Sequence, residues 1–287
     1  MVQVIAEGIS MIISIASGKG GTGKTTLAVN LALSMGDVHL VDCDVEEPNC
    51  HIFLKPETFE ARDVCVKVPD INHDLCDYCG KCSEFCQYNA LAVANRTMLE
   101  FPELCHSCGG CSIVCPKNAI SEREMRIGEV RSCKIGGLDF SYGILDIGKA
   151  MASPIIRSLK SAIDHNRDVI LDSPPGTSCA VIESVKGSDY CVLVTESTPF
   201  GLNDMKLAIE MLESIGVPYG VAINRYGLGD SSVDDYCSER DIPVLVRLPY
   251  DRRIAELYSK GVPFISELSK YSVIFNGMID SIREVVG

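Results

Sequence analysis

The chain has 287 residues, of which 46% are hydrophobic, and this suits one large domain with a small insertion. Its formal net charge of −13 argues against nucleic acid as the main partner, because phosphate backbones are bound by clustered Lys and Arg. No apolar run approaches the roughly 18 residues that cross a bilayer. Residues 1–8 lack the features of a signal peptide, and residues 1–10 are expected to be an extension. We therefore expect a cytoplasmic protein with no membrane partner.

Short apolar runs alternate with helical stretches along most of the chain. Apolar, β-branched runs predict strands at residues 11–16, 39–42, 169–172, 190–195, 217–224 and 243–248. Helical stretches are predicted at residues 25–35, 153–163, 202–215 and 233–240, and residues 271–286 are expected to form a terminal packing helix. This alternation indicates an α/β fold with a doubly wound, mostly parallel sheet, which gathers ligands at the carboxyl ends of its strands.

A glycine-rich loop follows the first predicted strand and opens the first predicted helix. It comprises Gly18, Lys19, Gly20, Gly21, Thr22, Gly23, Lys24, Thr25 and Thr26. Glycines let backbone N–H groups approach phosphate oxygens, and the helix N-terminus favours their negative charge. We expect Lys24 to contact the β- and γ-phosphates and Thr25 to bind Mg²⁺. The alternative is a chance glycine-rich turn.

Polar residues end three of the predicted strands. Asp42 and Asp44 end the second, Asp172 ends the third before a Ser-Pro-Pro-Gly turn, and Asn224 ends the fifth. We expect the acids to serve a bound nucleotide and its Mg²⁺. The alternatives are ordinary capping of strand ends for the acids and a turn residue for Asn224.

Eight of the fifteen cysteines form two copies of one pattern, Cys76, Cys79, Cys82 and Cys86, then Cys105, Cys108, Cys111 and Cys115. In this bacterial ferredoxin run, three cysteines hold one cluster and the fourth reaches the other. One 4Fe–4S cluster is thus predicted on Cys76, Cys79, Cys82 and Cys115. The other is predicted on Cys105, Cys108, Cys111 and Cys86. Zinc is the alternative, and we expect most of the remaining seven cysteines to be small buried residues.

The cysteine runs lie where the strand–helix alternation stops. This segment repeats itself and is too small to bury a sufficient core, so two clusters would hold it together. We expect an inserted small α+β ferredoxin-like domain at residues 69–127, within an ATPase domain formed by residues 1–68 and 128–287.

The run Lys19-Gly20-Gly21-Thr22-Gly23-Lys24-Thr25-Thr26 resembles the deviant Walker A motif of the MinD/ParA/Mrp superfamily. The resemblance covers nearly the whole chain and implies a P-loop ATPase that binds ATP or ADP with Mg²⁺. It implies an ATP-dependent homodimer in which Lys19 reaches the partner's nucleotide; the alternative is a solvated Lys19. It assigns water positioning to Asp44. It assigns Mg²⁺ to Thr25, Asp42 and Asp172, catalysis to Lys19, Lys24, Asp44 and Asp172, and the adenine pocket to Asn224, Arg225, Pro249 and Tyr250. Residues 248–251 and a following helix at residues 254–261 resemble the segment that walls the base pocket in this superfamily.

Two further cysteines can be compared with functional cysteines of other members of this superfamily. Cys179 stands where the nitrogenase iron protein has a cluster-ligating cysteine, although its second ligand has no counterpart here, and the alternative is a packed residue. The Cys-x-x-Cys that bridges dimers of cluster carriers is missing, since Cys237 stands alone.

Three functions remain open from the sequence. The first is an ATPase whose nucleotide state is coupled to electron transfer through two 4Fe–4S clusters. The second is a maturation or carrier factor that delivers an iron–sulfur or other metal centre to an apo-metalloprotein client. The third is a non-enzymatic regulator that senses redox state and nucleotide. A redox partner or client is implied in each case.

Overall fold

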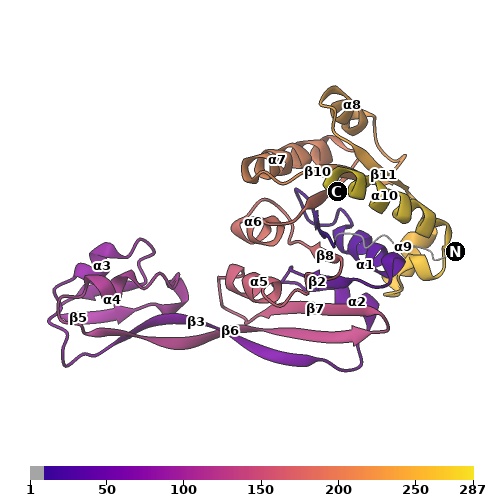
Figure 1. The fold of residues 1–287 in the computed structure, drawn as a ribbon. Helices are drawn as coiled ribbons and strands as arrows, with labels where there is room; N and C mark the ends of the chain where they lie inside the picture. Colours follow the sequence, from indigo (N-terminus) through magenta and orange to yellow (C-terminus); the bar gives the residue numbers. More distant parts are fainter. Residues whose placement is uncertain (1–9) are drawn as a thin grey trace.

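The computed structural model describes residues 10–287, and the expected N-terminal extension lies almost wholly outside this range. Figure 1 shows a body of sheet and helices from which a long ribbon extends to a smaller cysteine-bearing segment. No helix in the described range is long and apolar enough to cross a membrane.

The body is built on a nine-stranded sheet with the order β11-β10-β9-β1-β8-β2-β7-β6-β3. Six neighbouring pairs are parallel and two are antiparallel, which confirms the mostly parallel α/β fold. Six of its strands were expected: β1 (Ile12–Ala16), β2 (His39–Asp42), β8 (Val169–Asp172), β9 (Tyr190–Glu196), β10 (Tyr219–Tyr226) and β11 (Val244–Pro249). Three were not: β3 (Glu60–Ile71), β6 (Ile120–Ile135) and β7 (Leu138–Leu145).

Helices cover both faces of this sheet (Figure 1). One face packs against α1 (Lys24–Met35), α2 (Cys50–Leu54), α9 (Arg252–Ser259), the 3-10 turn η2 (Phe264–Ser266) and α10 (Lys270–Val286). The other face packs against α5 (Ser153–Lys160), α6 (Cys179–Val185), α7 (Pro199–Ile215) and α8 (Ser232–Glu239). The strands between them are almost wholly buried because each face is covered, as a parallel sheet requires.

The strands β3 and β6 form the ribbon, paired from Glu60 with Ser132 to Ile71 with Ile120. In β3, buried Val64, Val66 and Val68 alternate with exposed residues, so one face of the ribbon packs and the other is solvated. Both strands run without interruption from the body toward the far segment (Figure 1). The expected domain boundaries, after residues 68 and 127, fall inside them.

Residues 72–119 form the segment at the end of the ribbon. It contains α3 (Lys81–Phe85), β4 (Leu91–Ala94), β5 (Thr97–Glu100), the turn η1 (Pro102–Leu104) and α4 (Gly110–Val114). Its two halves repeat one backbone design: α3 follows Gly80 with φ +81°, and α4 follows Gly109 with φ +70°. A separate small core joins it to the ribbon and consists of Ile71, Cys82, Leu91, Met98 and Ile120.

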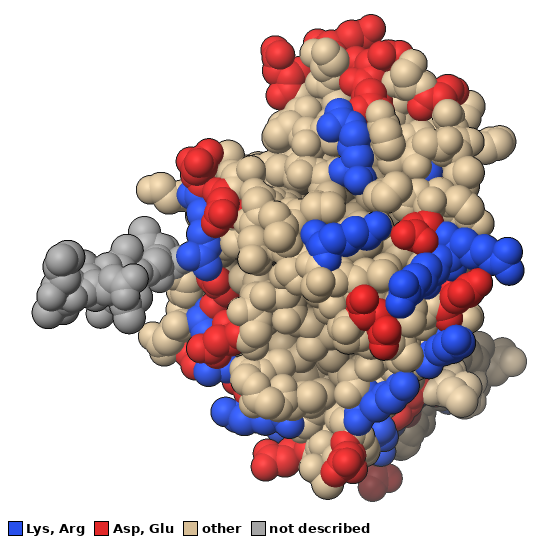
Figure 2. Space-filling model, turned by 90° about the vertical axis from the view of Figure 1, so that its right-hand side faces the viewer, with Lys and Arg blue, Asp and Glu red and all other residues tan. Residues whose placement is uncertain are grey.

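Charge is unevenly spread over the surface. On the face in Figure 2, acidic side chains gather at the top, where α8 lies, and Lys and Arg are interspersed with Asp and Glu below it. Asp234 and Asp235 stand in the first turn of α8, where carboxylates favour the helix dipole.

Candidate nucleotide site and cysteine clusters

The glycine-rich loop between β1 and α1 is closely packed against two other elements. A Cβ on Gly18 would lie 2.0 Å from the carbonyl oxygen of Asp204 in α7. A Cβ on Gly23 would lie 2.3 Å from Nδ2 of Asn224, and Gly23 has φ +95°. Contact distances this short exclude a larger side chain, so both positions require glycine.

A cavity of about 410 Å³ opens in front of this loop, within the range of small-molecule sites. Eleven residues that were expected to bind nucleotide line it: Gly20, Gly21, Gly23, Lys24, Thr25, Thr26, Asp44, Asn224, Arg225, Pro249 and Tyr250. Further lining residues, Leu248, Asp251, Ile254, Ala255 and Tyr258, lie in the segment that was likened to the wall of a base pocket. No sequence pattern marked Glu47, Asn49 and Phe264, because they reach the cavity only through the fold.

Five expected site residues do not line this cavity. Gly18 and Thr22 support the loop, and the Thr22 carbonyl accepts a hydrogen bond of 2.7 Å from Asn224 Nδ2. Asn224 Oδ1 accepts the backbone N–H of Arg225, so this side chain keeps one amide hydrogen for a ligand. Lys19 lies outside the cavity, and Asp42 and Asp172 are buried beneath it.

Two carboxylates, Asp42 and Asp172, are buried below the loop, and a third, Asp44, lines the cavity beside them. Asp42 accepts backbone N–H groups from Asp44 at 3.1 Å, Asn49 at 2.9 Å and Cys50 at 3.0 Å, which fixes the turn from β2 into α2. Burial, followed by the charge of Asp172, raises the pKa of Asp42 to about 7. Burial raises the pKa of Asp172 to about 6 against the lowering effect of Lys24, and burial with Asp42 raises the pKa of Asp44 to about 6. A cation here would relieve their repulsion.

The segments after β2 and β8 share the space beside the loop. Asp44, Glu46 and Glu47 from the first face Pro174 and Pro175 from the second across a cavity of about 330 Å³. The N–H of Gly176 donates to the Ser17 carbonyl at 2.9 Å, which ties the second segment to the start of the loop. Both segments therefore lie against the phosphate-binding loop and its cavity.

We expect Asp172→Asn to stabilise the ligand-free protein. The folded-state pKa of Asp172 is raised from 3.8 to about 6, so ionising this buried carboxyl lowers the free energy of unfolding. This destabilisation is absent below about pH 4, grows between about pH 4 and 6, and is fully present above that range. At pH 8 the variant should be more stable by about 1–3 kcal/mol, and at pH 4 the difference should vanish. Denaturant unfolding at both pH values measures this.

The matched control for that measurement is Glu284→Gln, an exposed position on α10. It should show no pH-dependent difference from wild type. Mg–ADP should stabilise wild type more than Asp172→Asn if Asp172 is the Mg²⁺ ligand that the sequence predicts. Equal stability of Asp172→Asn and wild type at pH 8 would contradict the burial argument.

The eight cysteines of the two runs gather in two sets at the end of the ribbon. Cys76, Cys79, Cys82 and Cys115 line one small cavity, and Cys86, Cys105, Cys108 and Cys111 line another. Each set therefore combines three cysteines of one run with the last cysteine of the other. The two sets are those that the ferredoxin pattern predicts, and the role of their residues as ligands stays a prediction.

The surroundings of these sulfurs suit a bound group larger than one ion. In residues 10–287 the only three acidic, His or Cys side chains whose ligand atoms all lie within 4.8 Å are Asp42, Cys50 and Asp172. In neither set, therefore, do three sulfurs all lie within 4.8 Å of one another, whereas a tetrahedral zinc holds its sulfur ligands roughly 3.8 Å apart. Backbone N–H groups of Ala90 and Ala119 donate to the sulfurs of Cys86 and Cys115 at 3.3 Å, contacts that stabilise cluster thiolates.

The other seven cysteines divide into two kinds. Cys43, Cys50, Cys191 and Cys237 are buried, as expected. Cys65 and Cys179 are exposed and Cys133 is partly buried. Cys179 is exposed because it is the first residue of α6, at the end of the segment that follows β8.

Comparison with known proteins agrees with this architecture. Residues 13–264 match the CobQ/CobB/MinD/ParA nucleotide binding domain. The chain is 31% identical over 264 residues to an uncharacterized protein of Methanocaldococcus jannaschii, covering 89% of this chain and 91% of that one. It is 24% identical over 308 residues to an iron-sulfur cluster carrier protein of the same organism, covering 98% and 88%.

Among solved structures, the fold is similar to that of the septum site-determining protein MinD of Pyrococcus horikoshii, complexed with Mg-ADP. The TM-score is 0.58 at 21% identity, and the match covers 97% of this chain and 98% of that one. It is also similar to a Cyanothece McdA variant in complex with ATP, with a TM-score of 0.56 at 17% identity over 96% of this chain and 97% of that one.

Proposed function

Because the chain belongs to the CobQ/CobB/MinD/ParA family of nucleotide-binding domains, we propose that it hydrolyses ATP and couples its nucleotide state to electron transfer. The electrons pass through two 4Fe–4S clusters in an inserted ferredoxin-like domain. The observation that carries this proposal is that eight cysteines form two interchanged sets at the end of a ribbon whose strands belong to the same sheet as the phosphate-binding loop.

The residues around the cavity have defined roles in this proposal. Backbone N–H groups of residues 20–25 and the Lys24 ammonium hold the phosphates. The N-terminus of α1 favours the negative charge of the phosphates. Thr25 and Asp172 hold Mg²⁺, with Asp42 behind them. Asp44 faces the same cavity and positions the attacking water for in-line displacement. Asn224, Arg225 and Tyr250 line the same cavity and bind the base.

The cysteine sets fit the proposed clusters by their chemistry. Burial raises the pKa values of Cys82, Cys105 and Cys111, the last to about 11, so these thiols need bound cations to lose their protons. When bound, the clusters supply one-electron redox chemistry. The surrounding chain holds them apart from bulk water on the buried side, through Leu91, Met98 and Ile120.

A continuous series of contacts links the nucleotide site to the ribbon. The turn held by Asp42 leads into α2, whose His51 stacks on Tyr142 of β7 with ring centroids 5.3 Å apart. Tyr142 accepts a hydrogen bond of 3.3 Å from Arg131 of β6. Displacement of α2 by nucleotide would therefore act on the base of the ribbon.

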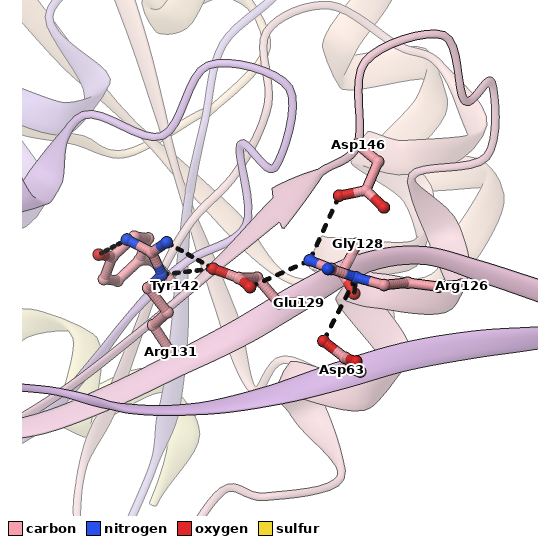
Figure 3. Close-up of polar contacts among 7 residues, drawn as sticks. All are labelled: Asp63, Arg126, Gly128, Glu129, Arg131, Tyr142 and Asp146. Carbon is pink, nitrogen blue, oxygen red and sulfur yellow. Dashed lines mark hydrogen bonds and ion pairs between the residues drawn. The ribbon is translucent and has the colours of Figure 1, made fainter.

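Figure 3 shows how this series continues into both ribbon strands. Glu129 accepts hydrogen bonds from Arg131 and from Arg126, the latter at 3.0 Å. Arg126 also pairs with Asp63 of β3 at 3.3 Å and with Asp146 after β7 at 3.4 Å. The two arginines share one carboxylate, so a shift at Tyr142 reaches the strands that carry the clusters.

We expect Glu129→Gln to weaken coupling while leaving hydrolysis and both clusters intact. Loss of the carboxylate removes the group that links Arg126 to Arg131. Substitutions of this kind change the coupling free energy between two sites by about 0.5–2 kcal/mol, which corresponds to a roughly 2- to 30-fold change in the effect of ATP. The measurement is the ratio of cluster reduction rates with and without Mg–ATP. Lys134→Gln, on the same strand and 78% exposed, is the control and should keep the wild-type ratio. An unchanged ratio in Glu129→Gln would exclude this route.

The proposal includes an ATP-dependent homodimer in the cytoplasm. Lys19 does not line the cavity of its own chain, which leaves it available to a second copy. Analytical ultracentrifugation of wild type with a non-hydrolysed ATP analogue should show a dimer. Lys19→Ala should stay monomeric under the same conditions.

An anaerobic reductive titration followed by EPR, with and without Mg–ATP, tests the proposed function. Signals of two interacting 4Fe–4S clusters that shift with ATP are the expected result. Two clusters indifferent to nucleotide would reject coupled electron transfer, and a protein that holds zinc and no iron would reject the clusters.

A second candidate is ATP-dependent delivery of a metal centre to a client. The similarity to an iron-sulfur cluster carrier over 98% of this chain favours it. Incubation with an apo-ferredoxin separates the two: a carrier loses its clusters to the acceptor, while an electron-transfer protein keeps them.

A further inference from the structure

Three buried side chains converge beneath the phosphate-binding loop from separate elements. Asp42 ends β2, Cys50 begins α2 and Asp172 ends β8, and each is at most 1% exposed. One carboxylate oxygen of each Asp and the Cys50 sulfur all lie within 4.8 Å of one another. The proposed ATPase gives Cys50 no role, so its presence in this group needs its own explanation.

The geometry of the group is close to that of a metal site with mixed ligands. The Cys50 sulfur lies 3.5 Å from Asp172 Oδ2. A tetrahedral ion with sulfur at about 2.3 Å and oxygen at about 2.1 Å would hold these atoms about 3.5 Å apart. Asp172 Oδ1 is buried without a hydrogen-bond partner, and an unpaired carboxylate oxygen in such a place favours a cation.

Ligand chemistry decides which cations suit this group. Two carboxylates alone suit Mg²⁺, whose ligands are oxygens. A thiolate adds preference for thiophilic ions such as Zn²⁺ or Fe²⁺. Because the pKa of the buried Cys50 thiol is well above its usual value, the incoming ion must displace the thiol proton to solvent.

We propose that Asp42, Cys50 and Asp172 bind a thiophilic divalent cation, and that this ion competes with Mg–nucleotide. Thr25 lines the nucleotide cavity above the group and belongs to both sites. Occupation by the thiophilic ion holds the turn into α2 in place without nucleotide. The inference rests on the nucleotide site of the proposed function and is independent of the clusters.

The probe is Zn²⁺, added anaerobically to protein with its full complement of iron, because empty cluster cysteines would also bind zinc. Equilibrium dialysis counts the bound zinc, and an unchanged cluster spectrum shows that iron stays in place. We expect wild type to bind about one zinc per chain and Cys50→Ala to bind at least about tenfold more weakly. Cys237→Ala, another buried cysteine, should bind as wild type does.

Competition completes the test. Mg–ADP should displace zinc from wild type, and zinc should raise the concentration of Mg–ADP needed for half-saturation. Cys50→Ser should keep Mg–ADP binding in the absence of zinc, which shows that the site is folded. Zinc binding that is equal in Cys50→Ala and wild type, or absent from wild type, would overturn the inference. Failure of wild type to bind Mg–ADP without zinc would instead refute the proposed nucleotide site.

Discussion

Replacing Cys115 by alanine is expected to remove the cluster of the first cysteine run and to spare the cluster of its own run. Cys115 shares a cavity with Cys76, Cys79 and Cys82, across the repeat. Iron content should fall by about half, since each cluster takes one cysteine from the other run. Iron analysis and EPR of the reduced protein measure this.

Paired variants make the test sharper. Cys76→Ala and Cys115→Ala should remove the same EPR signal, although their residues lie in different runs. Cys86→Ala and Cys105→Ala should remove the other signal, because these residues share the second cavity. Cys65→Ala, exposed on β3, is the control and should keep both. If Cys76→Ala and Cys115→Ala remove different signals, the interchange is wrong.

Loss of a cluster should also loosen the segment that holds it. Only five buried side chains make up its core, too few to stabilise it alone. We therefore expect faster proteolysis within residues 72–119 in Cys115→Ala than in Cys65→Ala, while the sheet body stays resistant.

Replacing Lys24 by alanine is expected to abolish stabilisation by nucleotide and to lower hydrolysis by about 10²- to 10³-fold. Lys24 is 8% exposed, lies in the cavity and lowers the pKa values of Asp44 and Asp172. Without its ammonium group, the phosphates would lie near the carboxylates of Asp44 and of the buried Asp42 and Asp172 with no lysine to offset the repulsion. Wild type with ADP at 100 times its Kd should gain about 2.7 kcal/mol, and the variant should gain none.

Comparison of Lys19→Ala with Lys24→Ala distinguishes the roles of the two lysines. Because Lys19 lies outside the cavity of its own chain, this variant should keep stabilisation by Mg–ADP. Its rate of ATP hydrolysis should be lower than that of wild type only under conditions in which the wild-type rate depends on protein concentration. Such a dependence is expected if a second copy of the chain contributes Lys19. Loss of Mg–ADP binding in Lys19→Ala would assign this lysine to its own nucleotide.

Local sequence was enough to predict much of the fold. Strands such as β2 and β8 and helices such as α1 and α10 lie where apolar spacing placed them. The strands β3, β6 and β7 were missed. In β3 the two-residue alternation of Val64, Val66 and Val68 was readable, but charged neighbours masked it, and its partner β6 lies beyond the whole cysteine segment.

The two parts of the candidate site differ in how far sequence could predict them. The phosphate loop is a short contiguous run whose glycines set its backbone, so residues 18–26 were sufficient. The opposite wall of its cavity was harder to predict. Tyr258 lies in the helix that was likened to the wall of a base pocket, whereas no pattern marks Phe264, which packing of η2 against α1 brings to the cavity. Asn224 was predicted for the base, and the structure adds its bond to the Thr22 carbonyl.

By itself, the sequence determined the phosphate loop and the repeated cysteine spacing, because both depend on residues close together in the chain. Only the tertiary structure decided that Cys50 lies 3.5 Å from Asp172, and that His51, Tyr142 and Arg131 connect α2 to the ribbon. These contacts join residues 122, 91 and 11 positions apart, and nothing in their local sequence favours them. They exist because the order of strands in the sheet sets β2 between β8 and β7, with β6 beside β7.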